Sequence, residues 1–301
     1  MIYLLLILAM VFWSFSFIWY KVVYLNFSPI TLVFLRLLIS SLLLFLFSAV
    51  MRKLVKVKTA DIKIFLLAAL FEPFIYFLGE SFGMKLVSST IAAIIVATIP
   101  LFTPLAASYF FREKLTGLNF TGLFISITGV AFVVFERGFT QTASVKGILL
   151  MLVAVTGAIG YSVCVKKLTD RYNAFTIVAW QNLIGLIYFA PLFFFFDKGY
   201  LHLLDKPLDT FYPVFKMAVC ASTVAFLLFT MGIGKIGVTR ANMFTNIIPV
   251  CTSILSFFML GERFTWYKVA GIVMVIMGLF LSQIGDILPA RRNAGASIDA
   301  T

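Results

Sequence analysis

Ten hydrophobic runs of about 20 residues dominate the chain and are separated by short polar breaks. A helix of about 20 apolar residues is long enough to cross roughly 30 Å of hydrocarbon. Only 12% of the residues are charged, against about 25% in a soluble domain. The pattern predicts an all-α integral membrane protein, and ten such runs exclude a soluble protein with buried helices. The predicted helices cover residues 2–20, 29–50, 62–78, 88–111, 116–135, 146–165, 174–196, 212–234, 238–260 and 265–285.

A duplicated block limits how these helices can be arranged. A shift of 149 residues superimposes residues 81–130 on residues 230–279 without a gap, and eleven of the fifty aligned pairs are identical. Such a match indicates internal repeats. We therefore expect two five-helix repeats, 1–137 and 146–285, and a disordered cytoplasmic tail over residues 286–301. Because five is an odd number, the second repeat enters the membrane from the opposite side, and the repeats are inverted. The identical pairs include Gly83/Gly232, Thr90/Thr239, Pro100/Pro249, Glu113/Glu262, Gly122/Gly271 and Gly129/Gly278.

The Glu and Gly residues of the twin blocks are interpreted as structural. Glu113 and Glu262 lie just before the last helix of each repeat, where the N-terminus of a helix favours an anion. The glycines of the last helices are seven residues apart within each pair, so each pair lies on one helix face. Small residues on one face allow two membrane helices to approach closely.

The charge distribution predicts the orientation in the membrane. The net charge of +12 mainly reports the retention of Lys and Arg in cytoplasmic loops. With a cytoplasmic N-terminus, fourteen of these residues lie on the cytoplasmic side and nine on the other side. We therefore expect a multi-pass protein of the inner (plasma) membrane, with both termini cytoplasmic and no nucleic-acid partner. The first run lacks a basic n-region and a cleavage site, and we interpret it as a retained helix.

The sequence offers little support for other function classes. It contains no GxxxxGK[ST] motif for ATP binding and no HExxH motif. The three cysteines lie inside hydrophobic runs without a CxxC pair, so neither a disulfide framework nor a metal site is indicated. We expect no metal, no cofactor and no enzymatic activity. The expected partners are a small-molecule substrate and the lipid bilayer, and a coupled proton is left open.

One of the identical pairs consists of two prolines, and both lie inside predicted helices. Pro100 and Pro249 lie twelve and eleven residues into their helices, near mid-membrane. A proline there removes one backbone hydrogen bond and kinks the helix, and the freed carbonyl must find a partner or line a cavity. Transporters built from inverted repeats bind substrate near the midplane, beside broken helices. The pair therefore favours a midplane site, and kinks that only shape packing are the alternative.

Two charged residues, Arg36 and Glu72, lie inside predicted helices. A charge in the bilayer core costs a few kcal/mol or more. Arg36 lies seven residues after the helix start at Pro29, and Glu72 lies seven residues before a helix end near Gly79. Both residues are therefore roughly 10 Å below the outer boundary, so neighbouring antiparallel helices could pair them. Two interpretations stay open. The pair is structural, or Arg36 holds a substrate carboxylate or Glu72 titrates during transport.

Amide side chains mark positions at which the two repeats differ. Gln181 takes the place of Arg36 in the second repeat, and Asn242 and Asn246 lie one turn apart where the first repeat has alanine. Hydrogen bonding between helices is the common role of such amides in a membrane. The proximity of Asn246 to Pro249 favours a cavity, so all three amides join the predicted substrate-binding set.

Aromatic residues complete the predicted site. Most of the 35 phenylalanines are expected to face lipid or to pack between helices. Trp13 and Phe17 lie one turn apart in the first run, and Tyr76 lies one turn beyond Glu72. These three residues could line an apolar cavity, and simple packing is the alternative for each of them.

Three parts of the chain carry a resemblance to a known family: Trp13-Ser-Phe-Ser-Phe, Phe34-Leu-Arg36, and the twin blocks that begin at Pro100 and Pro249. They resemble the drug/metabolite transporter superfamily, of the ten-helix EamA type, over nearly the whole chain. The resemblance implies a basket of helices around a central cavity with alternating access. Members export or exchange amino acids and other small metabolites, and relatives carry nucleotide-sugars. The usual Trp-Gly of the first helix is Trp13-Ser14 here, and Glu72 matches no family motif.

The expected function is secondary transport of small metabolites by alternating access, most simply the export or exchange of amino acids or related compounds. A membrane-embedded enzyme or a scaffold without transport activity is the alternative. An enzyme would need convergent nucleophilic and acid–base groups, and Glu72 is the one deep carboxylate that the predicted helices contain.

Overall fold

The computed structural model describes residues 1–103, 106, 117–134, 144–198, 201, 203, 206–263, 265–278 and 280–281. Within these residues the chain is helical and forms no β-strand. Glu113 and the expected tail over residues 286–301 lie outside the described residues, and their predicted roles stay predictions.

The first half of the chain begins with two long helices. The second of these, α2, starts at Ser28, whose side chain accepts a hydrogen bond from the backbone N–H of Thr31, with Pro29 in the first turn. Both features are typical of a helix N-terminus. The elements of this half are α1 (Ile2–Val23), α2 (Pro29–Val50), η1 (Thr59–Asp61), α3 (Ile62–Ala69), η2 (Leu70–Ile75), α4 (Tyr76–Met84), α5 (Ser89–Val96) and α7 (Gly117–Val134).

The described part of the second half is divided into more elements than the described part of the first. Its elements are α8 (Val145–Thr169), α9 (Ala174–Pro191), η3 (Leu192–Asp197), η5 (Leu208–Thr210), α10 (Phe211–Lys216), η6 (Met217–Ala225), α11 (Phe226–Ile236), α12 (Val238–Met243), η7 (Phe244–Asn246) and α13 (Ile247–Leu260). A further apolar helix covers Trp266–Gly278.

Seven helices in the described part of the chain are long and apolar enough to cross a membrane. Three shorter apolar helices accompany them: Ser89–Thr103, Phe120–Val133 and Trp266–Gly278. The protein is therefore a multi-pass membrane protein, as the hydrophobic runs predict. The number of ten spans and the inverted orientation of the repeats remain predictions.

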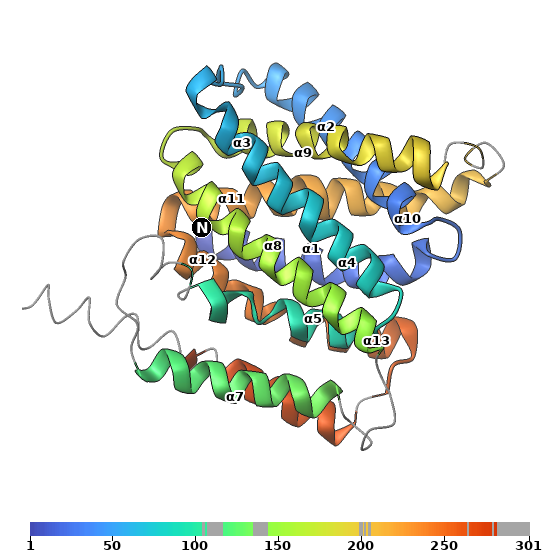
Figure 1. Cartoon of the computed structure of the whole chain (residues 1–301), viewed down its shortest axis with the longest axis vertical. Helices are drawn as coiled ribbons and strands as arrows, with labels where there is room; N and C mark the ends of the chain where they lie inside the picture. The colour runs from blue at the N-terminus through green and yellow to red at the C-terminus, as the bar shows by residue number, and fades with distance from the viewer. Residues whose placement is uncertain are drawn as a thin grey trace, which may run out of the picture.

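The two halves pack against each other in a reciprocal way (Figure 1). Helix α1 of the first half contacts α13 of the second, and α5 of the first contacts α8 of the second. Helices α2 and α9 also contact each other, in the upper part of Figure 1. The interior therefore lies at the interface of the halves, and residues from both can reach it.

The glycines of the twin blocks bring two helices together. A Cβ atom on Gly129 of α7 would lie 2.8 Å from the carbonyl oxygen of Gly271, and one on Gly278 would lie 2.5 Å from the carbonyl oxygen of Gly122. Helix α7 and helix Trp266–Gly278 thus approach closely, at the lower edge of Figure 1. This confirms the predicted close helix contact.

The third membrane segment is longer than predicted. It was expected to end near residue 78, but α4 continues to Met84. Gly79, which suggested a boundary, lies inside α4, where a Cβ atom would be 2.5 Å from the carbonyl oxygen of Leu150. The glycine serves close packing on α8 rather than ending the helix. The extension brings Glu80 into the membrane segment and changes the site.

Candidate functional site

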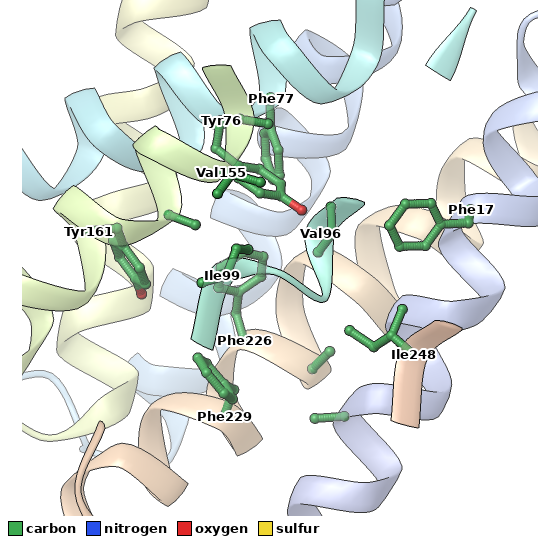
Figure 2. Packing of buried hydrophobic residues seen from close by; sticks show 14 of the residues in the cluster. Phe17, Tyr76, Phe77, Val96, Ile99, Val155, Tyr161, Phe226, Phe229 and Ile248 are labelled. Carbon is green, nitrogen blue, oxygen red and sulfur yellow. The ribbon is translucent and has the colours of Figure 1, made fainter. Parts of the chain in front are cut away.

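A cavity of about 60 Å³ lies between the two halves of the chain. Figure 2 shows its apolar members pointing toward one another from α1, α4, α8 and α11. The space suffices for a few water molecules, so a metabolite would require the helices to move apart. The lining residues are Trp13, Ser16, Phe17, Arg36, Glu72, Tyr76, Phe77, Glu80, Val96, Ile99, Ala158, Tyr161, Ser162, Phe226, Phe229, Asn242, Thr245 and Ile248.

Six of the eight residues of the predicted binding set line this cavity, and two do not. Gln181 lies behind the wall, where its Oε1 accepts a hydrogen bond of 2.8 Å from the hydroxyl of Tyr161. Asn246 is buried away from the cavity, and its Oδ1 has no hydrogen-bond partner among the described residues. The six lining residues are Trp13, Phe17, Arg36, Glu72, Tyr76 and Asn242.

Trp13 is held in place from both ends of its side chain. Its indole Nε1 donates a hydrogen bond of 3.2 Å to the carbonyl oxygen of Ala221. Its ring packs edge-on against Phe226 and Phe229, with centroid distances of 5.2 and 5.0 Å. These contacts fix one aromatic wall of the cavity.

Interrupted helices reach the cavity at matching positions of the two halves. In the first half α5 ends at Val96, residues 97–98 form a turn, and helix resumes through Pro100. In the second half α12 ends at Met243, η7 follows, and Pro249 lies in the first turn of α13. A proline is tolerated in the first turn of a helix because that N–H has no intrahelical acceptor. Each break precedes its proline by a few residues, and lining residues flank both breaks.

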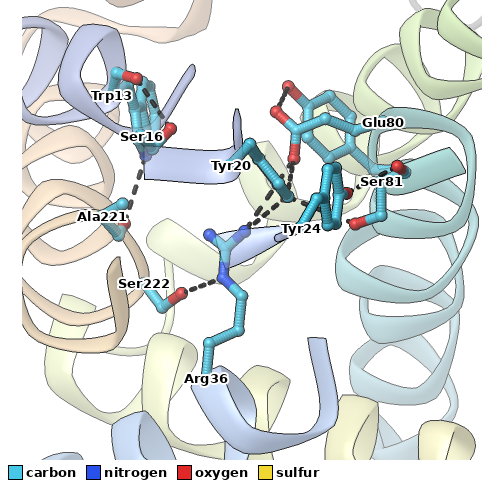
Figure 3. A network of polar contacts seen from close by, with 10 residues as sticks. Trp13, Ser16, Tyr20, Tyr24, Arg36, Glu80, Ser81, Ala221 and Ser222 are labelled. Carbon is cyan, nitrogen blue, oxygen red and sulfur yellow. Dashed lines mark hydrogen bonds and ion pairs between the residues drawn. The ribbon is translucent and has the colours of Figure 1, made fainter. Parts of the chain in front are cut away.

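Arg36 of α2 is engaged on several sides (Figure 3). Its Nε donates a hydrogen bond of 2.8 Å to the Ser222 hydroxyl, and its NH1 donates one of 2.6 Å to the Tyr20 hydroxyl. Its guanidinium carbon lies 4.2 Å from the ring centroid of Phe77. Only 2% of the residue is exposed.

The carboxylate that pairs with Arg36 is Glu80, which the sequence did not single out. NH1 of Arg36 lies 4.0 Å from Glu80 Oε2. The same oxygen accepts a hydrogen bond of 2.6 Å from Tyr20, and Oε1 accepts one of 3.2 Å from Tyr76. Glu80 thus has three partners, which are Tyr20 of α1, Arg36 of α2 and Tyr76 one turn earlier in α4, and the group forms a buried network.

The expected ion pair between Arg36 and Glu72 does not form. The depth estimate placed the end of the helix near Gly79, whereas the helix ends at Met84. Glu72 is therefore twelve residues before that end, or about 18 Å, and lies deeper than Arg36. The spacing of Glu72, Tyr76 and Glu80 by four residues could have identified Glu80, because such residues share one helix face.

Glu72 sits at a break in the helix. Its backbone is extended, with φ −147° and ψ 116°, and Pro73 follows it. A proline disfavours helical geometry in the residue before it, and it provides no N–H for the helix. Gly185 of α9 makes room for the proline ring, since a Cβ there would lie 2.1 Å from Pro73 Cγ.

The carboxylate of Glu72 has no partner in the described part of the chain. The residue is 7% exposed and lines the cavity, yet no hydrogen bond or ion pair to another described residue satisfies it. Among the described residues, no group of three His, Cys, Asp or Glu residues is placed to hold a metal ion. What the arrangement offers a ligand is one unpaired carboxylate within an aromatic cavity.

Polar contacts attach the start of the α3–α4 segment to the second half of the chain. Asp61 of η1 accepts hydrogen bonds of 2.5 Å from Arg171 and 2.7 Å from the Tyr172 hydroxyl. The bond to Asp61 raises the pKa of Tyr172, which lies in the connection between α8 and α9. The contact ties the start of α3 to the second half.

A second polar contact between the halves lies at the start of α5, just after the α3–α4 segment. Glu262 accepts hydrogen bonds of 3.1 Å from the backbone N–H of Ser89 and 2.7 Å from the hydroxyl of Thr90. It therefore caps the N-terminus of α5, in the other half, rather than the helix that follows it in sequence. The structural role expected for Glu262 is confirmed, with a different helix as its partner.

Comparison with known proteins links the chain to a family of transporters. A model of the EamA-like transporter family matches residues 1–135 and 145–283. The uncharacterized transporter YcxC of Bacillus subtilis is 26% identical over 208 residues, which are 65% of this chain and 65% of the relative, just under two thirds of its length. A probable amino-acid metabolite efflux pump of Escherichia coli K12 is 24% identical over 65% of this chain and 67% of the relative.

A solved structure shares the fold. This crystal structure matches with a TM-score of 0.67 at 16% sequence identity, and the match covers 93% of this chain and 96% of the other. At this identity the likeness concerns the fold alone.

Proposed function

The chain belongs to the EamA-like transporter family, and we propose that it is a secondary transporter that exports or exchanges amino acids or related small metabolites by alternating access. The observation that carries the proposal is the cavity between the two halves, which is lined by α1, α2 and α4 of one half and by α8, α11 and α12 of the other. A substrate bound there touches both halves, so a relative movement of the halves would change the side to which it is open.

The name of one relative supports amino acids as the class of substrate. The similar Escherichia coli protein is named a probable amino-acid metabolite efflux pump. The cavity also combines polar groups with apolar walls, as a site for a small zwitterion would require. In this proposal the protein lies in the plasma membrane with both termini in the cytoplasm, and a proton is the candidate coupling ion.

The alternative function of a membrane-embedded enzyme has weaker support. The family and the relatives' names indicate a transporter rather than an enzyme. Residues 79–83 do match the pattern GxSxG, which in hydrolases places a nucleophilic serine on a turn between strand and helix. Ser81 instead lies within helix α4, and its hydroxyl is 3.4 Å from that of Tyr20. The pattern therefore lacks the strand–turn–helix context of a hydrolase nucleophile.

The proposal is tested by flux through proteoliposomes that contain the purified protein. Vesicles loaded with a panel of amino acids are assayed for efflux and exchange, with and without a pH gradient. The expected result is protein-dependent flux of some panel members, and no flux of any member would contradict the amino-acid assignment. Dependence on the gradient would identify a coupled proton.

A matched pair of variants tests whether flux passes through the cavity. Ala158→Leu adds volume to the cavity wall, whereas Ala49→Leu adds the same volume to an exposed position of α2. The first variant is expected to abolish most flux and the second to leave it intact. Equal flux through both variants would place the pathway elsewhere.

A further inference from the structure

We infer that Glu72 is the residue that binds a positively charged amine of the substrate, so that the site selects compounds in which an ammonium group is attached to an apolar or aromatic body. The inference rests on the proposed transport function and adds to it the chemistry by which the cavity recognises its ligand. Three features of the cavity support it.

The first feature is the balance of charge in the cavity. Its charged lining residues are Arg36, Glu72 and Glu80. Arg36 and Glu80 are 4.0 Å apart and offset each other, so Glu72 leaves one negative charge when it is ionised. A buried carboxylate without a partner is costly, and ionisable residues inside membrane segments commonly mark ligand or ion pathways. A cationic ligand would supply the missing partner.

The second feature is the aromatic wall. Trp13, Phe17, Tyr76, Phe226 and Phe229 line the same cavity as Glu72. Aromatic faces attract cations, and they also accommodate the apolar part of a ligand. The cavity already holds one cation in this way, because the Arg36 guanidinium lies over the ring of Phe77.

The third feature is that the Arg36 guanidinium is already engaged by side chains of the protein. Its Nε and NH1 donate to Ser222 and Tyr20, and its charge is offset by Glu80, whose Oε2 lies 4.0 Å from NH1. Asn242, by contrast, lines the cavity and has an Nδ2 donor without a partner among the described residues. The carboxylate of an amino acid would therefore meet a neutral donor, and the ammonium group would be the part held by charge.

The test uses three ligands that share a phenyl ring on a short chain and differ in charge: phenethylamine, 2-phenylethanol and 3-phenylpropionate. Binding to the purified full-length protein is measured by equilibrium dialysis. The expected order places the amine at least about tenfold tighter than the neutral alcohol, since hydrogen bonds to charged groups are worth about 1.5–3 kcal/mol. The anion is expected to bind most weakly.

Variants assign the preference to Glu72. Glu72→Gln keeps the size of the side chain and is expected to bind the amine and the alcohol equally. Glu72→Asp keeps the charge on a shorter arm and should retain part of the preference, which guards against a folding defect in the first variant. Asp209→Asn removes a carboxylate from an exposed position of η5 and serves as the matched control, with unchanged binding.

Three outcomes would overturn the inference: tighter binding of 3-phenylpropionate than of phenethylamine, an unchanged amine preference in folded Glu72→Gln protein, or no binding of the amine to the wild-type protein. The same variants in proteoliposomes separate this inference from the proposed function. Amino-acid flux that is unaffected by Glu72→Gln would contradict the role of Glu72 but would agree with the proposed transport function. Amine binding that depends on Glu72, without flux of any kind, would contradict the proposed transport function but would agree with the binding role of Glu72.

Discussion

Glu72 and Glu80 are two carboxylates on one membrane segment, eight residues apart, and both are nearly fully buried. Glu80 accepts hydrogen bonds from Tyr20 and Tyr76 and faces the guanidinium of Arg36. Glu72 lines the same cavity and has no partner among the described residues. The difference shows that burial of a charge does not by itself identify a binding residue. The partners already present decide which carboxylate is free to bind a ligand.

The same comparison predicts opposite responses to mutation. Removing one partner of a buried, satisfied ion pair leaves an uncompensated charge and strongly destabilises a fold. Removing a buried charge that has no partner relieves a desolvation cost instead. The region around Glu80 should therefore behave as scaffold, and Glu72 should behave as a ligand-binding residue.

The largest expected effect is that of Arg36→Gln. The variant leaves Glu80 buried without its counter-ion and should lower the free energy of unfolding by about 3–5 kcal/mol. Thermal melting of the detergent-solubilised protein measures the change. The double variant Arg36→Gln/Glu80→Gln should recover part of the loss, because neither charge is then left alone. A single variant that melts like wild type but has lost ligand binding would instead make Arg36 a binding residue.

The next effect is that of Tyr20→Phe. The Tyr20 hydroxyl accepts from Arg36 and donates to Glu80, at 2.6 Å in both cases. Its removal leaves two buried charged groups short of a hydrogen bond and should cost about 1–3 kcal/mol. Melting curves for Tyr20→Phe and for Tyr188→Phe, whose hydroxyl is exposed and makes one long bond of 3.3 Å, provide the comparison. Equal stability of the two variants would show that Tyr20 does not bridge the pair.

A smaller effect is expected for Tyr76→Phe. Its hydroxyl donates the longer of the two hydrogen bonds to Glu80, at 3.2 Å, and a typical hydrogen bond contributes about 1 kcal/mol net. The loss of stability should therefore be smaller than for Tyr20→Phe, while the aromatic wall of the cavity is kept. A loss as large as that of Arg36→Gln would mean that Tyr76, rather than Arg36, is the main partner of Glu80.

The smallest effect on stability is expected for Glu72→Gln. The carboxylate has no partner to lose among the described residues, and its replacement by a neutral amide removes a buried charge. The melting temperature should stay the same or rise slightly in the absence of ligand. A fall comparable to that of Tyr20→Phe would reveal a structural partner of Glu72.

Much of the fold was predictable from the sequence because membrane spans leave a strong local signal. Runs of about 20 apolar residues predict helices, and the glycines of the twin blocks predict the close contact between α7 and helix Trp266–Gly278. The duplication could be detected by a fixed shift without any tertiary information. Its inverted geometry remains a prediction that follows from the odd number of helices per repeat.

The site was predictable only in part because it depends on where helices break and end. Six expected residues line the cavity, but their contact with a substrate is still a prediction. Glu80 was missed because Gly79 was interpreted as a helix end, whereas it packs on α8. The predicted pairing of Arg36 with Glu72 was wrong because the depth of Glu72 was counted from a helix end near Gly79, whereas α4 ends at Met84. Local composition does not show whether a glycine ends a helix or packs inside one.

The most direct test of the difference between the two carboxylates measures Glu72→Gln and Glu80→Gln side by side, by melting temperature and by phenethylamine affinity. We expect Glu80→Gln to lower the melting temperature, and Glu72→Gln to keep the melting temperature while amine affinity falls by about tenfold or more. The opposite assignment, with amine binding lost in a stable Glu80→Gln protein and kept in a destabilised Glu72→Gln protein, would contradict this expectation.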